Sequence, residues 1–129
     1  MTEAIINGEN FSNLQEFYDE VEAQLTKNLD WKIGRNLSAF NDVLRGGFGL
    51  HEYEEPLYLK WINLSKSKMD FGWTATIKYL EDKLKNCHPT NVESVLADLE
   101  YAKNKNGQTL YEIILGIISE HEHIQFDKK

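Results

Sequence analysis

The chain has 129 residues, of which 41% are hydrophobic and 27% are charged, and its formal net charge is −7. This composition is typical of one soluble globular domain, residues 1–129, large enough to bury a core without disulfides. The single cysteine, Cys87, excludes an internal disulfide and suits a reducing, cytoplasmic compartment. No apolar run approaches the ~20 residues that span a bilayer, and no basic-then-apolar signal opens the chain.

The acidic residues are concentrated in the first half of the chain. Residues 1–59 carry 11 acidic and 4 basic side chains, whereas residues 60–85 carry 6 basic and 3 acidic ones. A negative field of this kind repels nucleic acid and attracts a basic partner. The alternative is that the acidic side chains serve only solubility.

The first predicted elements are a strand at residues 4–6, ended by an Asn-Gly turn, and a helix that runs to about Leu25. Ser12 and Gln15 have the spacing of a capping box, so we expect this helix to begin at Ser12.

The next predicted helix covers residues 35–45 and has two distinct faces. Its apolar positions recur at three- and four-residue spacing and therefore share one face: Leu37, Phe40, Val43 and Leu44. Asp42 falls on the opposite side, with Ser38, Asn41 and Arg45 near it. Asn36 is placed to cap the first turn, and the glycines from Gly46 end the helix.

The rest of the chain continues the alternation of strands and helices. Residues 57–62 are nearly all apolar, as in a strand buried on both faces, and helices are expected at 73–85 and 92–102. A second apolar run, residues 110–118, is expected to be a buried strand, and residues 119–129 a frayed or weakly helical tail. This order predicts an α/β fold with one small three-stranded parallel sheet and flanking helices, β-α-α-β-α-α-β.

Gly34, Asn36, Ala39, Asp42 and Leu44 together resemble the second-helix motif of the barstar family of ribonuclease inhibitors. Other segments resemble that family in the same order along the chain. They are its first strand and turn (4–9), second strand (55–61), the segment after it (64–68), its last helix (93–103) and its last strand (113–115). Extra residues occur around 46–54 and 70–90.

The resemblance implies a single-domain inhibitor that binds the basic active-site cleft of a ribonuclease toxin in a 1:1 complex, as an immunity protein. The family's central carboxylate falls on Asp42, where it can stand in for a substrate phosphate. The chain departs from the family at Asn41, Ser38 and Tyr101, which replace an aromatic residue and two acids, and at Lys32-Ile33, which replace paired tyrosines. We therefore expect a different ribonuclease partner, reached partly through the enlarged 46–55 loop.

The predicted partner-binding surface combines this helix with the loops beside it. Loop aromatics next to an acidic helix are good interface anchors, although packing against the core is an equal alternative for each. The tryptophans Trp61 and Trp73, in contrast, are expected in the core. The predicted partner-binding residues are Trp31, Arg35, Ser38, Asn41, Asp42, Arg45, Phe48, Glu52, Tyr53, Glu54 and Tyr101.

Catalysis has little support in the sequence. His121 and His123 could be half of a metal site, but no third and fourth ligand is evident, so we expect neither metal nor cofactor. Residues 46–49 lack the lysine of a phosphate-binding loop, and Cys87 beside His88 does not suggest a nucleophile. Two alternatives to the inhibitor stay open. One is an interaction module that has lost inhibition, and the other is a small α/β enzyme with a pocket of convergent titratable groups.

Overall fold

The computed structural model describes residues 2–27, 29, 34–47, 49 and 52–129. Three parallel strands form one sheet in the order β1-β2-β3, with β1 at Thr2–Asn7, β2 at Leu57–Ile62 and β3 at Ile124–Lys128. The described residues also form six α-helices: α1 (Leu14–Leu25), α2 (Leu37–Arg45), α3 (Leu64–Asp70), α4 (Trp73–Asn86), α5 (Val92–Lys103) and α6 (Leu110–Ser119). The predicted α/β fold with a three-stranded parallel sheet is confirmed, but four helices rather than two separate β2 from β3.

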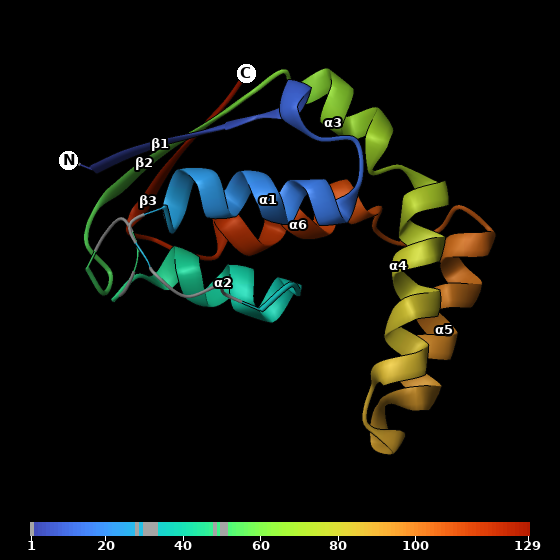
Figure 1. Ribbon diagram of the computed structural model, residues 1–129. Coiled ribbons are helices and arrows are strands. Elements are labelled where there is room, and N and C mark those ends of the chain that lie inside the picture. Colours follow the sequence, from blue (N-terminus) through green and yellow to red (C-terminus); the bar gives the residue numbers. More distant parts are fainter. Residues whose placement is uncertain (1, 28, 30–33, 48, 50–51) are drawn as a thin grey trace.

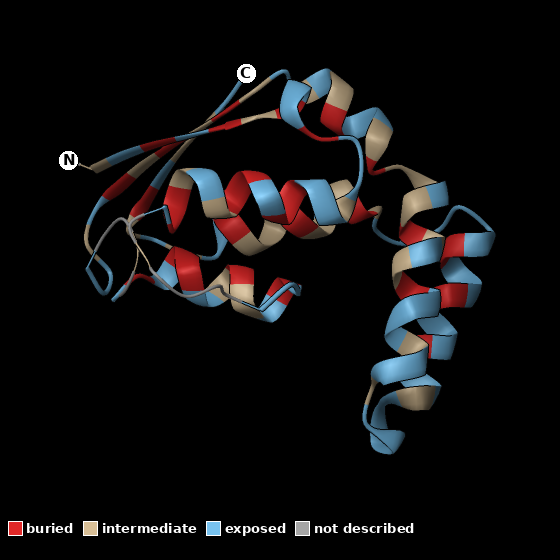
Figure 2. Ribbon diagram, in the orientation of Figure 1, coloured by how far each residue is buried: buried red, intermediate tan, exposed pale blue. Residues whose placement is uncertain are grey.

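The sheet has one buried face. In β2, Leu57, Leu59 and Trp61 are fully buried, whereas the residues between them are only half-buried. Helices α1 and α6 lie on the buried side, α1 along β1 and α6 along β3 (Figures 1 and 2). The prediction that this strand is buried on both faces is therefore wrong, because these two helices pack on the same side.

Aromatic rings join α2 to the centre of the core. Phe17 of α1 contacts Phe40 of α2 with ring centroids 5.2 Å apart, and it stacks on Trp61 of β2 at 5.6 Å. The indole of Trp61 donates a hydrogen bond to the hydroxyl of Ser67 (3.0 Å), so its polar atom is satisfied inside the core. Trp61 is thus a core residue as predicted, and α2 is fixed to the body through Phe40.

Residues 110–118 form a helix, not the predicted strand. Thr109 and Glu112 make a capping box at the start of α6, with the Thr109 hydroxyl accepting from the Glu112 N–H and the carboxylate accepting from the Thr109 N–H. The fully buried residues of this helix, Leu110, Ile114 and Ile118, recur at a spacing of four. A continuous apolar run has no visible period, so the sequence pattern alone could not separate a buried helix from a buried strand.

The third strand lies in the predicted tail. Residues 124–128 pair in parallel with β2, with Ile124 opposite Leu57 and Phe126 opposite Leu59. The expectation of a frayed or helical end is therefore wrong. Alternation of apolar Ile124 and Phe126 with polar neighbours is the pattern of a strand with one covered face.

The N-cap of helix α1 lies one residue later than predicted. Asn13 is its N-cap and accepts the Glu16 N–H at 2.9 Å, while the Glu16 carboxylate accepts the Ser12 N–H at 2.9 Å. The cap is therefore displaced from the expected Ser12–Gln15 pair, because the Asn13 side chain makes the same bond one position on. The helix ends at Leu25, as predicted.

Helices α4 and α5 form a hairpin that projects from the body, which we call the arm (Figure 1). Both helices were predicted at these places. The arm has its own apolar cluster, Leu80, Leu99 and Ala102, with half-buried Trp73 packed against it, so Trp73 belongs to this cluster and not to the main core.

Within the described ranges, no helix is long and apolar enough to cross a membrane.

Candidate functional site

Helix α2 presents a polar face to solvent because its apolar face is committed to the core. Leu37, Phe40, Val43 and Leu44 are buried. The Asn36 side chain caps the helix by accepting the Ala39 N–H at 2.7 Å, as predicted. On the outer face, Ser38, Asp42 and Arg45 are exposed.

The Asp42 carboxylate is the most prominent charge on this face. Its side chain is 60% exposed, and one oxygen lies 3.4 Å from Nη1 of Arg45. A pair this long and this exposed contributes little to stability. The Asp42 carboxylate can therefore exchange Arg45 for another cation at small cost.

The last turn of α2 is connected to two distant segments through its carbonyl groups. The Gly46 N–H donates to Asp42 O and Val43 O, at 3.3 and 3.2 Å. The Glu54 N–H donates to Arg45 O at 2.7 Å, and Nε2 of His123 lies 2.8 Å from Leu44 O. All four terminal carbonyls, which have no partner within the helix itself, are thereby satisfied. The turn at residues 52–55 and the segment before β3 are thus both attached to the end of α2.

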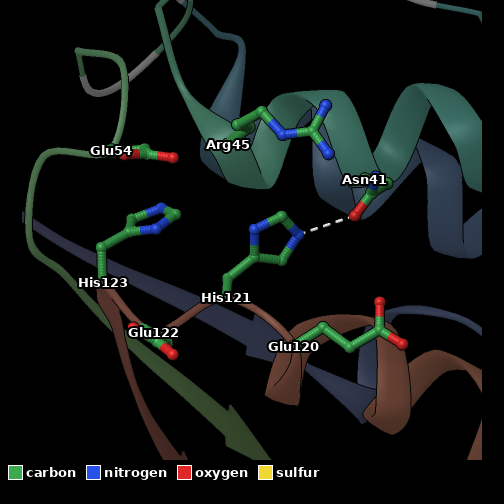
Figure 3. A pocket seen from close by; sticks show the side chains of 7 residues that line it. All are labelled: Asn41, Arg45, Glu54, Glu120, His121, Glu122 and His123. Carbon is green, nitrogen blue, oxygen red and sulfur yellow. Dashed lines mark hydrogen bonds between the residues drawn. The ribbon is translucent and has the colours of Figure 1, made fainter.

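A shallow hollow of about 620 Å³ lies where these segments meet (Figure 3). It is lined by Asn41, Arg45, Glu54, Glu120, His121, Glu122 and His123. Nε2 of His121 lies 2.7 Å from Oδ1 of Asn41, and the two imidazole rings meet edge to face with centroids 5.5 Å apart. Because both Nε2 atoms face oxygen acceptors, the hydrogen is assigned to Nε2 in each neutral ring.

The surroundings of His121 favour its neutral form. Burial lowers the pKa of His121 below its usual 6.5, and the neighbouring His123 and Arg45 lower it further, while Glu120 and Glu54 act in the opposite direction. The imidazole is therefore uncharged near neutral pH.

Arg35 lies at the entry to α2 but faces α1. Its guanidinium donates to the backbone oxygen of Gln15 (2.9 Å) and contacts Asp19 at 2.5 Å and Glu22 at 3.3 Å. The hydrogen bond to Asp19 raises the pKa of Arg35 above its ordinary value. This residue therefore fixes the start of α2 against α1.

Most of the predicted binding residues lie at one end of α2. Asn41, Asp42 and Arg45 are joined there by the turn that carries Glu52, Tyr53 and Glu54, in which Tyr53 is 63% exposed. Ser38 lies one turn earlier on the same helix. Tyr101 is also exposed but lies on α5, in the arm, away from α2 (Figure 1). Trp31 and Phe48 fall outside the described residues.

Sequence reasoning missed the C-terminal part of this site. Glu120, His121 and His123 line the hollow because α6 ends and β3 begins beside α2. The helix before the last strand is α6, whereas Tyr101 lies on α5. Two sequence signals could have indicated these elements: the Thr109–Glu112 capping box for α6 and the apolar–polar alternation of residues 124–128 for β3.

Comparison with known proteins gives one family. No curated protein matches the chain. A sequence model of the family described as Barstar (barnase inhibitor) matches residues 1–108, from β1 through α5 and including α2. The matched region covers well over half of the chain, and with the parallel sheet and the motif on α2 it shows that this chain belongs to the barstar family.

Proposed function

We propose that this protein is a cytoplasmic immunity protein that inhibits a basic ribonuclease toxin by placing one face of α2 in the enzyme's active-site cleft. The observation that carries the proposal is the exposed polar face of α2 in a chain of a family of barnase inhibitors. Arg35 attaches the start of this helix to α1, and backbone hydrogen bonds attach its end to the turn at residues 52–55. We refer to this face, with the turn at residues 52–55, as the α2 surface. One copy of the chain binds one enzyme.

The charge of the α2 surface complements a ribonuclease cleft, which must be basic because it binds polyanionic RNA. The carboxylates of Asp42, Glu52 and Glu54 lie on or beside α2, and Glu120 and Glu122 lie across the hollow. A carboxylate at Asp42 accepts two parallel hydrogen bonds from an arginine and so replaces a substrate phosphate. Long-range attraction of this kind accelerates association more than it raises affinity.

Tyr53 supplies an apolar anchor next to these charges. Its ring is 63% exposed in a turn whose backbone is bonded to the end of α2. Exposed tyrosines of this kind contribute much of the binding energy at protein interfaces when they fill a pocket on the partner. Arg35 acts indirectly, because it holds the start of α2 on α1.

The enzyme alternative is tested by the same experiment. Titratable groups do converge in the hollow, but the Nε2 atoms of His121 and His123 are both engaged by oxygen acceptors that belong to α2. These imidazoles therefore serve to attach α2 to the segment before β3. An assay of the chain alone for RNA cleavage separates the two possibilities.

The decisive experiment is a titration of ribonuclease activity. Barnase and any ribonuclease encoded beside this gene are each mixed with increasing amounts of the protein, and cleavage of a fluorogenic RNA is recorded. We expect activity to fall linearly to zero at one equivalent with the cognate enzyme, and co-expression to rescue cells from it. Undiminished activity of both enzymes, or cleavage by the chain alone, would contradict the proposal.

A further inference from the structure

Two imidazoles fasten the C-terminal half of α2 to the segment that follows α6. His121 hydrogen-bonds to the Asn41 side chain at 2.7 Å (Figure 3). His123 hydrogen-bonds to the Leu44 carbonyl at 2.8 Å. The connected residues lie 79 and 80 positions apart in the sequence. Asp42 stands between the two bonded positions, so whatever moves this half-turn moves Asp42.

We propose that His121 and His123 are positioning residues, which hold the binding half of α2 in place only while the His121 ring is neutral. The inhibitor then loses affinity for its ribonuclease in acid, a consequence that rests on the proposed function. The fastening itself is a property of the free protein. It can be tested without any partner.

The groups around the two rings explain the direction of the effect. Arg45 of α2 faces them from one side, Glu54 from the turn, and Glu120 and Glu122 from the segment between α6 and β3. Burial already opposes a charge on His121, and protonation of this ring would place a positive charge beside Arg45 and beside the His123 ring, whose centroid is 5.5 Å away. Glu54 and Glu120 offset only part of this repulsion, since the pKa of His121 is lowered on balance.

Proton linkage gives the direction in which acid shifts the equilibrium between the closed and the open state of the end of α2. When the end of α2 opens, His121 regains a pKa near its usual 6.5, whereas in the closed state its pKa is lower. Below about pH 6.5 the open state therefore binds more protons than the closed state. Acid thus favours opening, and the two histidine contacts hold α2 fully only above about pH 6.5.

The first test uses amide hydrogen exchange in the free protein, between about pH 8 and pH 5. Protection factors for α2 are compared with those for α1 in the same molecule, after correction for intrinsic exchange. We expect α2 to lose protection in acid relative to α1, because the open state binds the proton more tightly than the closed state. A proton NMR titration of the wild-type protein should place the midpoint of His121 below its usual 6.5.

Variants assign the effect to these two rings. His121→Gln with His123→Gln keeps an N–H donor near each acceptor but does not titrate, so protection of α2 should become independent of pH. His88→Gln is the matched control and should behave like the wild type. Equal loss of protection in α1 and α2, or an unchanged acid response in the double variant, would overturn the proposal. If the double variant does not fold, the wild-type titration still decides, and a His121 midpoint at or above the usual 6.5 would overturn the proposal.

The binding measurement separates this inference from the proposed function. With a ribonuclease that the protein inhibits, the dissociation constant should rise more steeply in acid for the wild type than for the double glutamine variant. Identical slopes would refute the role of the two histidines in binding. If exchange shows the fastening but no ribonuclease is inhibited, the proposed function fails and the fastening stands.

Discussion

Replacement of Asp42 by alanine should release the ribonuclease while leaving the fold intact. The carboxylate is 60% exposed and 3.4 Å from an Arg45 side chain that is itself 46% exposed, so the pair contributes at most about 1 kcal/mol to stability. Asp42 also lies in the last turn of α2, where a negative charge opposes the helix dipole by about 0.3–1 kcal/mol. These two small contributions have opposite signs, and the unfolding midpoint should hardly change.

The effect of Asp42→Ala on binding should be much larger. Truncating one member of a desolvated, hydrogen-bonded charge pair costs about 2–5 kcal/mol, which corresponds to roughly 30-fold to several thousandfold in dissociation constant. The matched control is Asp82→Ala, because Asp82 is 58% exposed and also pairs with a base on its own helix, Lys78 of α4. Denaturant unfolding and inhibition titrations should be run on both variants. Equal affinities of the two variants would refute the assignment of Asp42 as the polar anchor.

Three further predictions concern electrostatics and the core. Association with the ribonuclease should slow as salt rises, because exposed charges are screened beyond ~8 Å at physiological ionic strength; a salt-independent on-rate in stopped-flow would leave the acidic residues with a role in solubility only. Glu20→Ala should lower the free energy of unfolding, measured in urea, by about 1–3 kcal/mol. The reason is that the buried Glu20 carboxylate accepts the Asn7 N–H at 2.8 Å, and the variant leaves this N–H without its acceptor. A loss below about 0.5 kcal/mol would contradict this role. Burial raises the pKa of Tyr18 above its usual 10.0, so the unfolded chain releases this proton first and stability should fall as pH rises above 10. Tyr18→Phe should make that loss of stability smaller. An unchanged dependence of stability on alkaline pH in this variant would contradict the role of Tyr18.

The binding helix could be predicted from the sequence because its signals are local. The cap at Asn36, the stop at Gly46 and the apolar spacing between them all lie within eleven residues, and each has the same structural meaning in the folded chain. The same holds for α4 and α5, whose apolar stripes have a clear helical period. These helices could therefore be located from the sequence without knowledge of the tertiary contacts.

The last part of the chain could not be predicted in this way. The run at 110–118 is apolar on nearly every side, so its period is hidden, and β3 is recognisable chiefly by its pairing with β2, which lies more than sixty residues earlier. The capping pair Thr109–Glu112 was the local signal for a helix and outweighs the apolar run.

The hollow beside α2 could not be predicted for a similar reason. It is assembled from the end of α2, the turn at residues 52–55 and the segment before β3, which come together only through the sheet. The contacts of Arg35 show the same limit. Its guanidinium is bonded to α1 residues 16 and 20 positions earlier, and no local pattern indicates these contacts.

The location of the ribonuclease on the protein shows directly whether α2 is the binding helix. Amide chemical shifts of the labelled protein should be followed by NMR as unlabelled cognate ribonuclease is added to one equivalent. We expect the largest changes on α2 and on residues 52–55, while the signals of α5, including Tyr101, keep their free-state positions. Large changes on the arm with α2 unaffected would contradict binding through α2.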